Sequence, residues 1–392
     1  MKKSKKIYQA LYELVIFKFS CMKDAEKRMF FMKETNTPKM PKILITLRKD
    51  GKNGGPFNSH MRILQSGLQS KYELKPVWIP KPRELMRRKG MNALVSKIKE
   101  EAPDLVQLTG LQLEGFFVMR ACKKAKVKTI LAVHGSSMEA LTVGALKKGI
   151  LRFLERYTVK KADYVFGVSD YVSNWSVCRC AKHSVETIYN MYNINQYNGA
   201  ADIKLREKLG LKPTDVVVAS TGRIVKDKGF DVFWEVIQSI GHTDSIKYLI
   251  AGDGAFFSEW ENDIKLKGYD KEVFLLGYQE NVVPLLDAAD IFMICTKHET
   301  LCMSLLEAAN ARLPLVATNV GGIPEIISEG QNGYLISKND VKAFQSALLK
   351  LINDERLRKE MGANAQAMVS HKFGEKQILE ALDNLYTKAI AK

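Results

Sequence analysis

From residue 42 to its end the chain alternates short β-branched runs with longer amphipathic stretches, and this alternation limits the fold more than any other feature. The amphipathic stretches include residues 57–70, 84–100 and 146–161. Strands that alternate with helices form right-handed βαβ units, which build a mostly parallel sheet. The pattern therefore predicts an α/β fold. The runs predicted to be strands are 43–47, 74–79, 105–108, 129–133, 164–168, 185–189, 216–220, 247–251, 273–276, 291–295, 315–317 and 333–336.

A polar stretch rich in Asn and Lys, at about residues 192–215, interrupts the alternation near the middle of the chain. The 392 residues are enough for two domains, because a domain takes about 150 residues. We expect two doubly wound, Rossmann-like domains that face a central cleft, where such sheets bind ligands. The predicted divisions are an appended segment at 1–39, an N-terminal domain at 40–195, a C-terminal domain at 196–374 and a helix at 375–392 that packs back on the N-terminal domain.

The net charge of +17 is concentrated at one end of the chain. Residues 1–100 hold 24 Lys and Arg against 8 Asp and Glu, so nearly all of the excess lies in the first quarter. This asymmetry predicts a polyanionic partner, either membrane headgroups or nucleic acid, unless the lysines serve only as solubilising residues. Residues 146–161 add six basic side chains among apolar ones at helical spacing, which is typical of a helix on a bilayer surface or of a half-buried helix.

Residues 1–39 look like an addition to the fold. Four lysines in the first six positions precede apolar residues near helical spacing, which fits a basic amphipathic helix on a membrane or a helix packed on the body of the protein. A third interpretation is that translation begins at Met40. The chain shows neither a secretory signal nor the run of about 20 apolar residues that a membrane-spanning helix needs. The six cysteines form no C-x-x-C pair and indicate a reducing compartment, so we expect a cytoplasmic protein that can bind the inner face of the cell membrane.

The loop after the first predicted strand, RKDGKNGGPFN at residues 48–58, is rich in glycine. Glycines let backbone N–H groups approach an anion, and the helix predicted from Phe57 offers its positive end. Gly54 and Gly55 are therefore candidate phosphate-binding residues, although an ordinary turn has the same composition. The chain has neither G-x-G-x-x-G nor G-x-x-x-x-G-K-[ST], which disfavours dehydrogenases and P-loop nucleotide hydrolases.

Two cations follow the first predicted strand of the second domain, in TGRIVKDKGFD at residues 221–231. Arg223 and Lys228 stand five residues apart across a short loop, so both can reach one diphosphate, Arg as a fork and Lys as a point charge. The carboxyl end of a strand is also where α/β sheets bind ligands. The alternative is a pair of solvated surface charges.

Two glutamates, Glu299 and Glu307, are separated by seven residues in CTKHETLCMSLLEAANARLPLVATNVGGIPEII, at residues 295–327. If a helix begins at Glu299, eight steps of 1.5 Å place the two residues about 12 Å apart. That is about the span from a sugar to a ribose across a diphosphate, so the carboxylates can accept hydrogen bonds from both ends of a nucleotide sugar. The span exceeds the roughly 5–10 Å of a glycosidase pair. A solvent-facing glutamate pair on a helix is the alternative.

Taken together, these segments resemble the retaining glycosyltransferases of family 4, which have the GT-B fold. The resemblance is strong over residues 187–374 and weaker over 40–186. IYNMYNINQY, at 188–197, is similar to the family's linker. The chain departs from the family pattern at Cys302, where glycine is common, and at Met191, where glycine is expected. The motifs that follow in the family's order are GRIVKDKGFD, LIAGDG, VFLLGY, LLDAADIFMICTKHETLCMSLLEAANARLPLVATNVGGIPEII and NGYLI.

The resemblance implies a role for each matching residue. Glu299 contacts hydroxyls of the donor sugar, Glu307 binds the ribose, and His134 of LAVHG lies near the donor sugar. Arg223 and Lys228 bind the diphosphate. The implied catalytic residues are His134, Arg223, Lys228 and Glu299, and the implied donor-binding residues are Gly54, Gly55, Gly254, Tyr278, Gly321, Gly322 and Glu307.

The implied chemistry is departure of a nucleoside diphosphate from the anomeric carbon of the sugar. Cations and helix N-termini stabilise the negative charge that develops on the leaving group. No D-x-D sequence is present, so we expect no metal and no cofactor. No residue stands out as a covalent nucleophile, and the resemblance implies retention of configuration, with the departing diphosphate assisting deprotonation of the acceptor.

The expected partners are a nucleotide-sugar donor and a glycan acceptor. Family frequency favours a UDP-sugar, with a GDP-sugar second, and the activity is of the hexosyltransferase type. A lipid-linked or surface-polysaccharide acceptor explains the basic first quarter, since it places the enzyme on an anionic membrane. A GT-B nucleotide-sugar epimerase is an alternative, although the further acid/base residues that it needs are not identifiable. A basic nucleic-acid-binding protein is another, but its motifs are absent and we expect no nucleic-acid partner.

Overall fold

The computed structural model describes residues 39–48, 55–136, 145–192 and 203–391. Pro41–Lys392 form one compact unit. The predicted amphipathic helix of the appended segment and the predicted domain boundary at 195/196 both lie outside the described residues. None of the described helices is both long enough and apolar enough to cross a bilayer.

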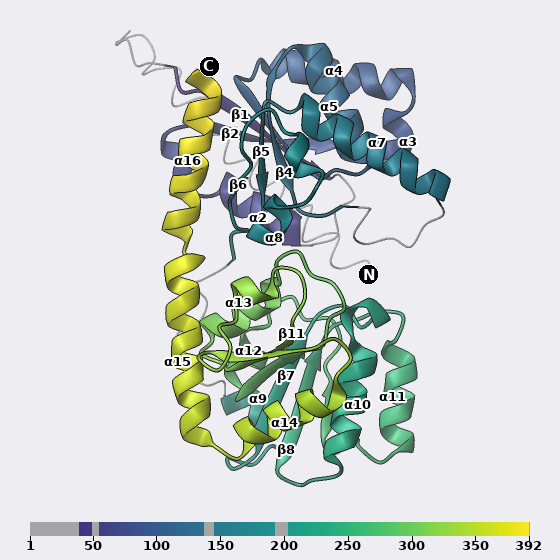
Figure 1. The fold of residues 1–392 in the computed structure, drawn as a ribbon, viewed down its shortest axis with the longest axis vertical. Helices are drawn as coiled ribbons and strands as arrows, with labels where there is room; N and C mark the ends of the chain where they lie inside the picture. Colours follow the sequence, from purple (N-terminus) through teal and green to yellow (C-terminus); the bar gives the residue numbers. More distant parts are fainter. Residues whose placement is uncertain (1–38, 49–54, 137–144, 193–202, 392) are drawn as a thin grey trace, which may run out of the picture. The chain divides into compact units, whose positions relative to one another are not determined.

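Two parallel six-stranded sheets, each with helices around it, make up the described fold (Figure 1), which confirms the predicted α/β class. The order in the first sheet is β2-β1-β3-β4-β5-β6 and in the second β12-β11-β10-β7-β8-β9. Every predicted strand lies on an observed one, with ends that agree within two residues. The strands of the first sheet are β1 Lys42–Arg48, β2 Glu73–Ile79, β3 Leu105–Thr109, β4 Lys128–Val133, β5 Tyr164–Gly167 and β6 Glu186–Thr187; those of the second are β7 Val216–Thr221, β8 Ile246–Ala251, β9 Val273–Leu275, β10 Ile291–Ile294, β11 Leu315–Thr318 and β12 Gly333–Ile336.

Two of the three amphipathic stretches around the first sheet form shorter helices than predicted, whereas the third, at 146–161, is helical throughout. The single helix expected at 84–100 is two helices, and Gly90 shows why: a Cβ at this position would lie 2.3 Å from the carbonyl oxygen of Glu84. The close approach lets the second helix start against the end of the first, a contact that only glycine permits. The elements in this part are α2 Gly55–Leu64, η1 Gly67–Ser70, α3 Pro82–Leu85, α4 Arg88–Glu101, α5 Leu113–Ala125, α7 Ala145–Lys161, α8 Asp170–Ser173 and η2 Cys178–Cys180.

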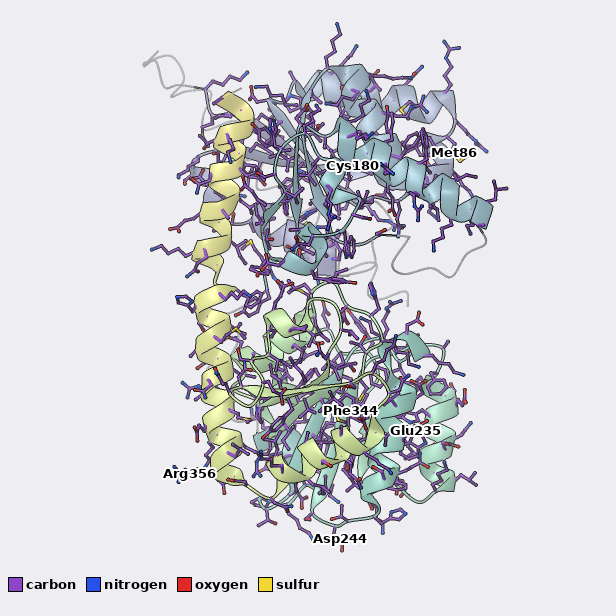
Figure 2. The ribbon with its side chains drawn as sticks, viewed as in Figure 1. Met86, Cys180, Glu235, Asp244, Phe344 and Arg356 are labelled. Atoms are coloured by element: carbon purple, nitrogen blue, oxygen red, sulfur yellow. The ribbon has the colours of Figure 1, made fainter. Side chains whose placement is uncertain are left out.

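The second sheet is covered by helices that bury large apolar side chains against it. Phe344 of α14 is fully buried (Figure 2), as are Phe230 and Phe233 of α10. The central strand β10, IFMI, is a continuous buried apolar run, as expected where both faces of a sheet are covered. The elements in this part are α9 Ile203–Lys208, η3 Lys226–Lys228, α10 Phe230–Ile240, α11 Phe257–Leu266, α12 Val283–Asp287, α13 Met303–Asn310, η4 Ile323–Glu325 and α14 Val341–Ile352.

The last two helices connect the second sheet with the first. α15, Glu355–Lys372, packs on α13 and β11, whereas α16, Glu375–Ala391, contacts β3 and β4 of the first sheet (Figure 1). Tyr386 of α16 is fully buried, and its hydroxyl donates to Oε1 of Gln107 in β3 at 2.6 Å. The core of the first sheet therefore includes side chains from the end of the chain.

Candidate functional site

A cavity of about 650 Å³ is lined by residues from both sheets and their loops. Helix α2, the end of β4 and Asn190 contribute from the first part of the chain, and the loops after β7, β8 and β10 contribute from the second. These strands are parallel, so their carboxyl ends gather side chains at one edge of each sheet. The predicted site residues that line this cavity are Gly55, His134, Arg223, Lys228, Tyr278, Glu299 and Glu307.

Three predicted donor-binding glycines, Gly254, Gly321 and Gly322, are not among the lining residues. Each lies close to the backbone of a neighbouring loop: a Cβ on Gly321 would lie 1.7 Å from the carbonyl oxygen of Glu299, and one on Gly254 would lie 2.3 Å from that of Ile224. These positions let the loops of the site pack together. Their contact with a donor stays a prediction, and Gly54 lies outside the described residues.

Lys228 and Glu299 form an ion pair inside the cavity, in which the Lys228 ammonium donates to Oε1 of Glu299. Lys228 ends the short helix η3, and the turn after it needs Gly229, which has φ 68° and whose Cβ would lie 1.7 Å from the carbonyl oxygen of Cys295. Both side chains of the pair are mostly buried. The residues predicted for the diphosphate and for the donor sugar are thus direct neighbours.

Arg223 is the more exposed of the two predicted diphosphate ligands. Among the described residues its guanidinium has neither a hydrogen-bond nor an ion-pair partner, so its donors face the cavity unpaired. An unpaired fork beside a lysine provides a bidentate and a point-charge contact for one anion.

Glu307 lies on α13 and faces Arg62 of α2, a residue that the sequence reasoning missed. Burial raises the pKa of Glu307 to about 7, although the Arg62 guanidinium opposes this rise. Arg62 Nη1 also donates to the carbonyl oxygen of Met191 at 2.8 Å. The helix α13 begins at Met303, not at Glu299, so the eight helical steps assumed for the glutamate pair were wrong, although both glutamates line the cavity.

The raised pKa of Glu307 predicts that stability falls as pH rises. The folded protein binds a proton at Glu307 up to about pH 7, whereas the ordinary pKa is 4.5, so folding takes up a proton between these values and loses stability across that window. We expect Glu307→Gln to be more stable than the native protein by on the order of 2 kcal/mol at pH 8, and by under about 1 kcal/mol at pH 5. Urea unfolding at both values measures this.

The control for this prediction is Glu235→Gln, which makes the same change on the exposed side of α10 (Figure 2). Its stability relative to the native protein should not change between pH 5 and pH 8. A Glu307→Gln protein that is less stable than the native one at pH 8 would show that the charged carboxylate stabilises the fold through Arg62.

His134 lies at the end of β4 beside a second buried histidine, His60 of α2, which the sequence reasoning also missed. Their Nε2 atoms are 3.4 Å apart and their rings meet edge to face. His60 Nδ1 lies 2.9 Å from the Thr109 hydroxyl, and its Nε2 lies 3.3 Å from the amide nitrogen of Gln107. A sequence signal existed: Gln107 and Thr109 are polar and two apart in the strand LVQLT, so they share one face.

Burial determines the charge of both histidines. It lowers the pKa of His60 to about 4, and it lowers the pKa of His134 well below the usual range, with His60 adding a smaller effect. His134 is therefore a neutral imidazole at pH 7. It can exchange a hydrogen bond with a bound molecule but does not contribute a positive charge.

A second cavity, of about 610 Å³, shares Pro56 and His134 with the first. The ends of β1, β3 and β4 and the start of α5 surround it, with Thr109 and Glu114 among the lining residues. The carboxylate of Glu114 pairs with Arg48 at 3.3 Å. His134 therefore borders both cavities.

No group of three or more His, Cys, Asp or Glu side chains with the geometry of a metal site occurs in the part of the chain that the structure describes. The predicted absence of a metal stays a prediction.

Two stretches of the chain match known families. Residues 202–368 match the family described as glycosyl transferases group 1, and residues 67–179 match the glycosyl transferase 4-like domain. The first match spans all six strands of the second sheet, and the other spans β2 to β5.

Characterised relatives share about a quarter of the aligned residues. The chain is 25% identical over 262 residues to N-acetyl-alpha-D-glucosaminyl L-malate synthase of Bacillus anthracis, covering 67% of this chain and 68% of the relative. It is 24% identical over 321 residues to UDP-Gal:alpha-D-GlcNAc-diphosphoundecaprenol alpha-1,3-galactosyltransferase of Escherichia coli, covering 78% and 81%. The fold is similar to that of the Anabaena protein Alr3699/HepE in complex with UDP-glucose, with a TM-score of 0.71, 20% identity and coverage of 88% of this chain and 99% of that one.

Proposed function

Because this chain belongs to the family 4 glycosyltransferases and has the GT-B fold, we propose that it transfers a hexosyl unit from a UDP-sugar to a glycan acceptor with retention of configuration. Use of a nucleotide-sugar donor follows from the family. The observation that carries the finer proposal is the cavity in which Arg223, Lys228, Glu299 and Glu307 come together from separate loops.

The four side chains bind different parts of the nucleotide-sugar donor. Arg223 and Lys228 stabilise the diphosphate as it departs, because preorganised cations cost little reorganisation when negative charge develops. Met303 and Ser304, at the start of α13, bring the positive end of that helix to the same cavity. Glu307 accepts hydrogen bonds from the ribose, and Glu299 accepts them from the sugar and from the Lys228 ammonium.

His134 lies where the two cavities meet and acts on the reacting sugar as a neutral group. A neutral imidazole can donate to a sugar hydroxyl or accept from one, and it does not repel the positive charge that builds on the anomeric carbon. The acceptor enters through the second cavity, so that its hydroxyl meets the donor beside His134. The leaving diphosphate then takes the acceptor's proton.

The acceptor is proposed to be a lipid-linked or surface-polysaccharide glycan, and the enzyme is proposed to work in the cytoplasm on the inner face of the cell membrane. The name of the Escherichia coli relative includes a diphosphoundecaprenol-linked acceptor, which supports this choice. UDP-glucose in the Anabaena structure supports the uridine donor over a GDP-sugar. The epimerase and the nucleic-acid-binding protein are not favoured by these similarities.

Donor use without a metal is the test of this function. Incubation with radiolabelled UDP-glucose, UDP-galactose or UDP-N-acetylglucosamine in excess EDTA should release UDP slowly through hydrolysis of one donor. The same donor, and UDP alone, should raise the melting temperature, because a ligand that binds only the folded state stabilises it. Activity that disappears with EDTA and returns with Mn²⁺ would overturn metal independence, and the absence of any effect from all UDP- and GDP-sugars would overturn the transferase proposal.

A further inference from the structure

A third cavity, of about 620 Å³, lies against helix α7, and none of its described lining residues lines the two cavities of the site. Its walls come from α7, from the loop after β4 and from the segment after α8. Hydrogen-bond donors dominate the described part of the lining. The residues that provide them are Ser136, Lys148, Arg152, Arg156, Trp175 and Ser176.

The three cations of this cavity stand four residues apart on α7 and therefore share one face of the helix. Lys148, Arg152 and Arg156 are exposed, and within the described parts of the chain their side chains have neither ion-pair nor hydrogen-bond partners. Three unpaired positive charges around one concavity form a strongly anion-attracting site.

Two buried side chains of this cavity also favour binding of an anion: an indole N–H without a hydrogen-bond partner, and a carboxylate that already accepts a hydrogen bond. Trp175 is 7% exposed, and its indole Nε1 has no hydrogen-bond partner among the described residues, an unusual state for a buried N–H. Glu155 also lines the cavity, but it is buried and its Oε2 accepts from the Ser136 hydroxyl at 2.7 Å. The donors are thus in excess, and phosphate oxygens satisfy such a set.

We propose that this cavity binds the phosphate groups of a membrane-borne acceptor, a proposal that rests on the function proposed above. The location of this third cavity, called the anion cavity below, supports the proposal. Ser136 lines it and follows His134, which lines the donor cavity, by two residues, so their Cα atoms are at most about 7 Å apart. A phosphate held by the cations of this cavity leaves the attached sugar within reach of His134.

Exposed apolar side chains indicate that the phosphate is carried by a lipid. Leu146, Ile150 and Phe153, on a neighbouring face of α7, are 82%, 54% and 65% exposed. Met86, at the end of α3, is 67% exposed and projects outward (Figure 2). Apolar and basic side chains on one helix are the pattern of a surface that enters the headgroup region of a bilayer.

The test compares two pairs of substitutions on α7 with equal change in charge. Arg152→Gln with Arg156→Gln removes two cations from the cavity, whereas Lys147→Gln with Lys160→Gln removes two exposed cations that do not line it. All proteins carry Arg223→Gln and Lys228→Ala, so that the donor cavity binds little of the probe. Calorimetric titration with inorganic pyrophosphate should show at least about a tenfold loss of affinity for the cavity pair and under about twofold for the control pair. Circular dichroism and melting curves confirm that each variant is folded.

Vesicle sedimentation separates a lipid-borne phosphate from a soluble one. Vesicles of phosphatidylcholine with phosphatidylglycerol should bind the native protein, and phosphatidylcholine alone should not. The cavity pair should weaken this binding more than the control pair, and Ile150→Ser with Phe153→Ser should weaken it without changing pyrophosphate affinity. Equal losses for the two charge pairs would overturn the cavity as a specific site, and binding of pyrophosphate without preference for anionic vesicles would overturn the lipid source.

These measurements use no sugar donor. If they succeed while the protein neither binds nor hydrolyses any UDP- or GDP-sugar, the anion cavity stands and the transferase proposal fails. If the protein hydrolyses a donor but the cavity pair binds pyrophosphate as tightly as the control pair, the transferase proposal is supported and the proposal that this cavity binds the acceptor's phosphate is wrong.

Discussion

Lys228→Ala should lower turnover roughly 10²–10³-fold, the loss expected when one preorganised donor to a developing negative charge is removed. The substitution also leaves the Glu299 carboxylate, which is mostly buried, without its cation. Both effects reduce stabilisation of the transition state, so kcat should fall more than KM rises. Steady-state kinetics of donor hydrolysis and of transfer measure the two constants.

The matched control is Lys226→Ala, in the same short helix but outside the cavity, which should keep nearly native turnover. Arg223→Lys should recover only part of the activity of the native enzyme, because lysine cannot replace the bidentate fork of arginine. Native turnover in the Lys228→Ala protein would contradict the assignment of this lysine to the diphosphate.

The two glutamates should separate sugar recognition from nucleotide recognition. Glu307→Ala should weaken binding of UDP by roughly 10–10²-fold, because it removes a hydrogen-bonding partner of the ribose and leaves Arg62 facing an empty position. Glu299→Ala should lower kcat/KM by a similar factor, yet leave UDP affinity close to native, because the Lys228 ammonium remains free to hold the diphosphate. Calorimetry with UDP and kinetics with the donor measure the two effects.

Each glutamate variant is the control for the other, since both remove one carboxylate from the same cavity. Glu307→Gln serves as a second form of the ribose variant that keeps the shape of the side chain. Identical profiles for Glu299→Ala and Glu307→Ala would mean that sugar and ribose are not divided between these residues.

The strands could be predicted from sequence because the middle of a parallel sheet is buried on both faces. Apolar runs such as KTILAV and IKYLIA have no other place in the fold, so their number and order followed directly. The gathering of Arg223, Lys228 and Glu299 could be predicted for a related reason, since each lies in the segment that follows the carboxyl end of a strand. Glu307 reaches the same cavity from helix α13.

The residues that the sequence did not reveal depend on which elements become neighbours. His60 and Arg62 lie on helix α2, whose sequence indicates only an amphipathic helix. Their place in the site follows from their contacts with His134 and Glu307, which lie far away in the sequence. At Gly254 and Gly321 the backbone of one loop lies directly against the backbone of another. A sequence motif cannot distinguish a glycine needed for this packing from a glycine that contacts a ligand. The start of α13 was also not predictable: the backbone is extended at Cys302, so the helix begins at Met303, after the loop that carries Glu299.

The crossing of α16 onto the first sheet has a consequence for synthesis. Tyr386, Leu382 and Leu385 complete the hydrophobic cluster that contains Ile43 and Ile130, so the first half of the protein lacks part of its core until the last helix is made. At 5–20 residues per second, the roughly 200 residues between β6 and Tyr386 take about 10–40 s to translate. During that interval an apolar face of the nascent chain stays uncovered, and holding it soluble becomes a task for chaperones at the ribosome.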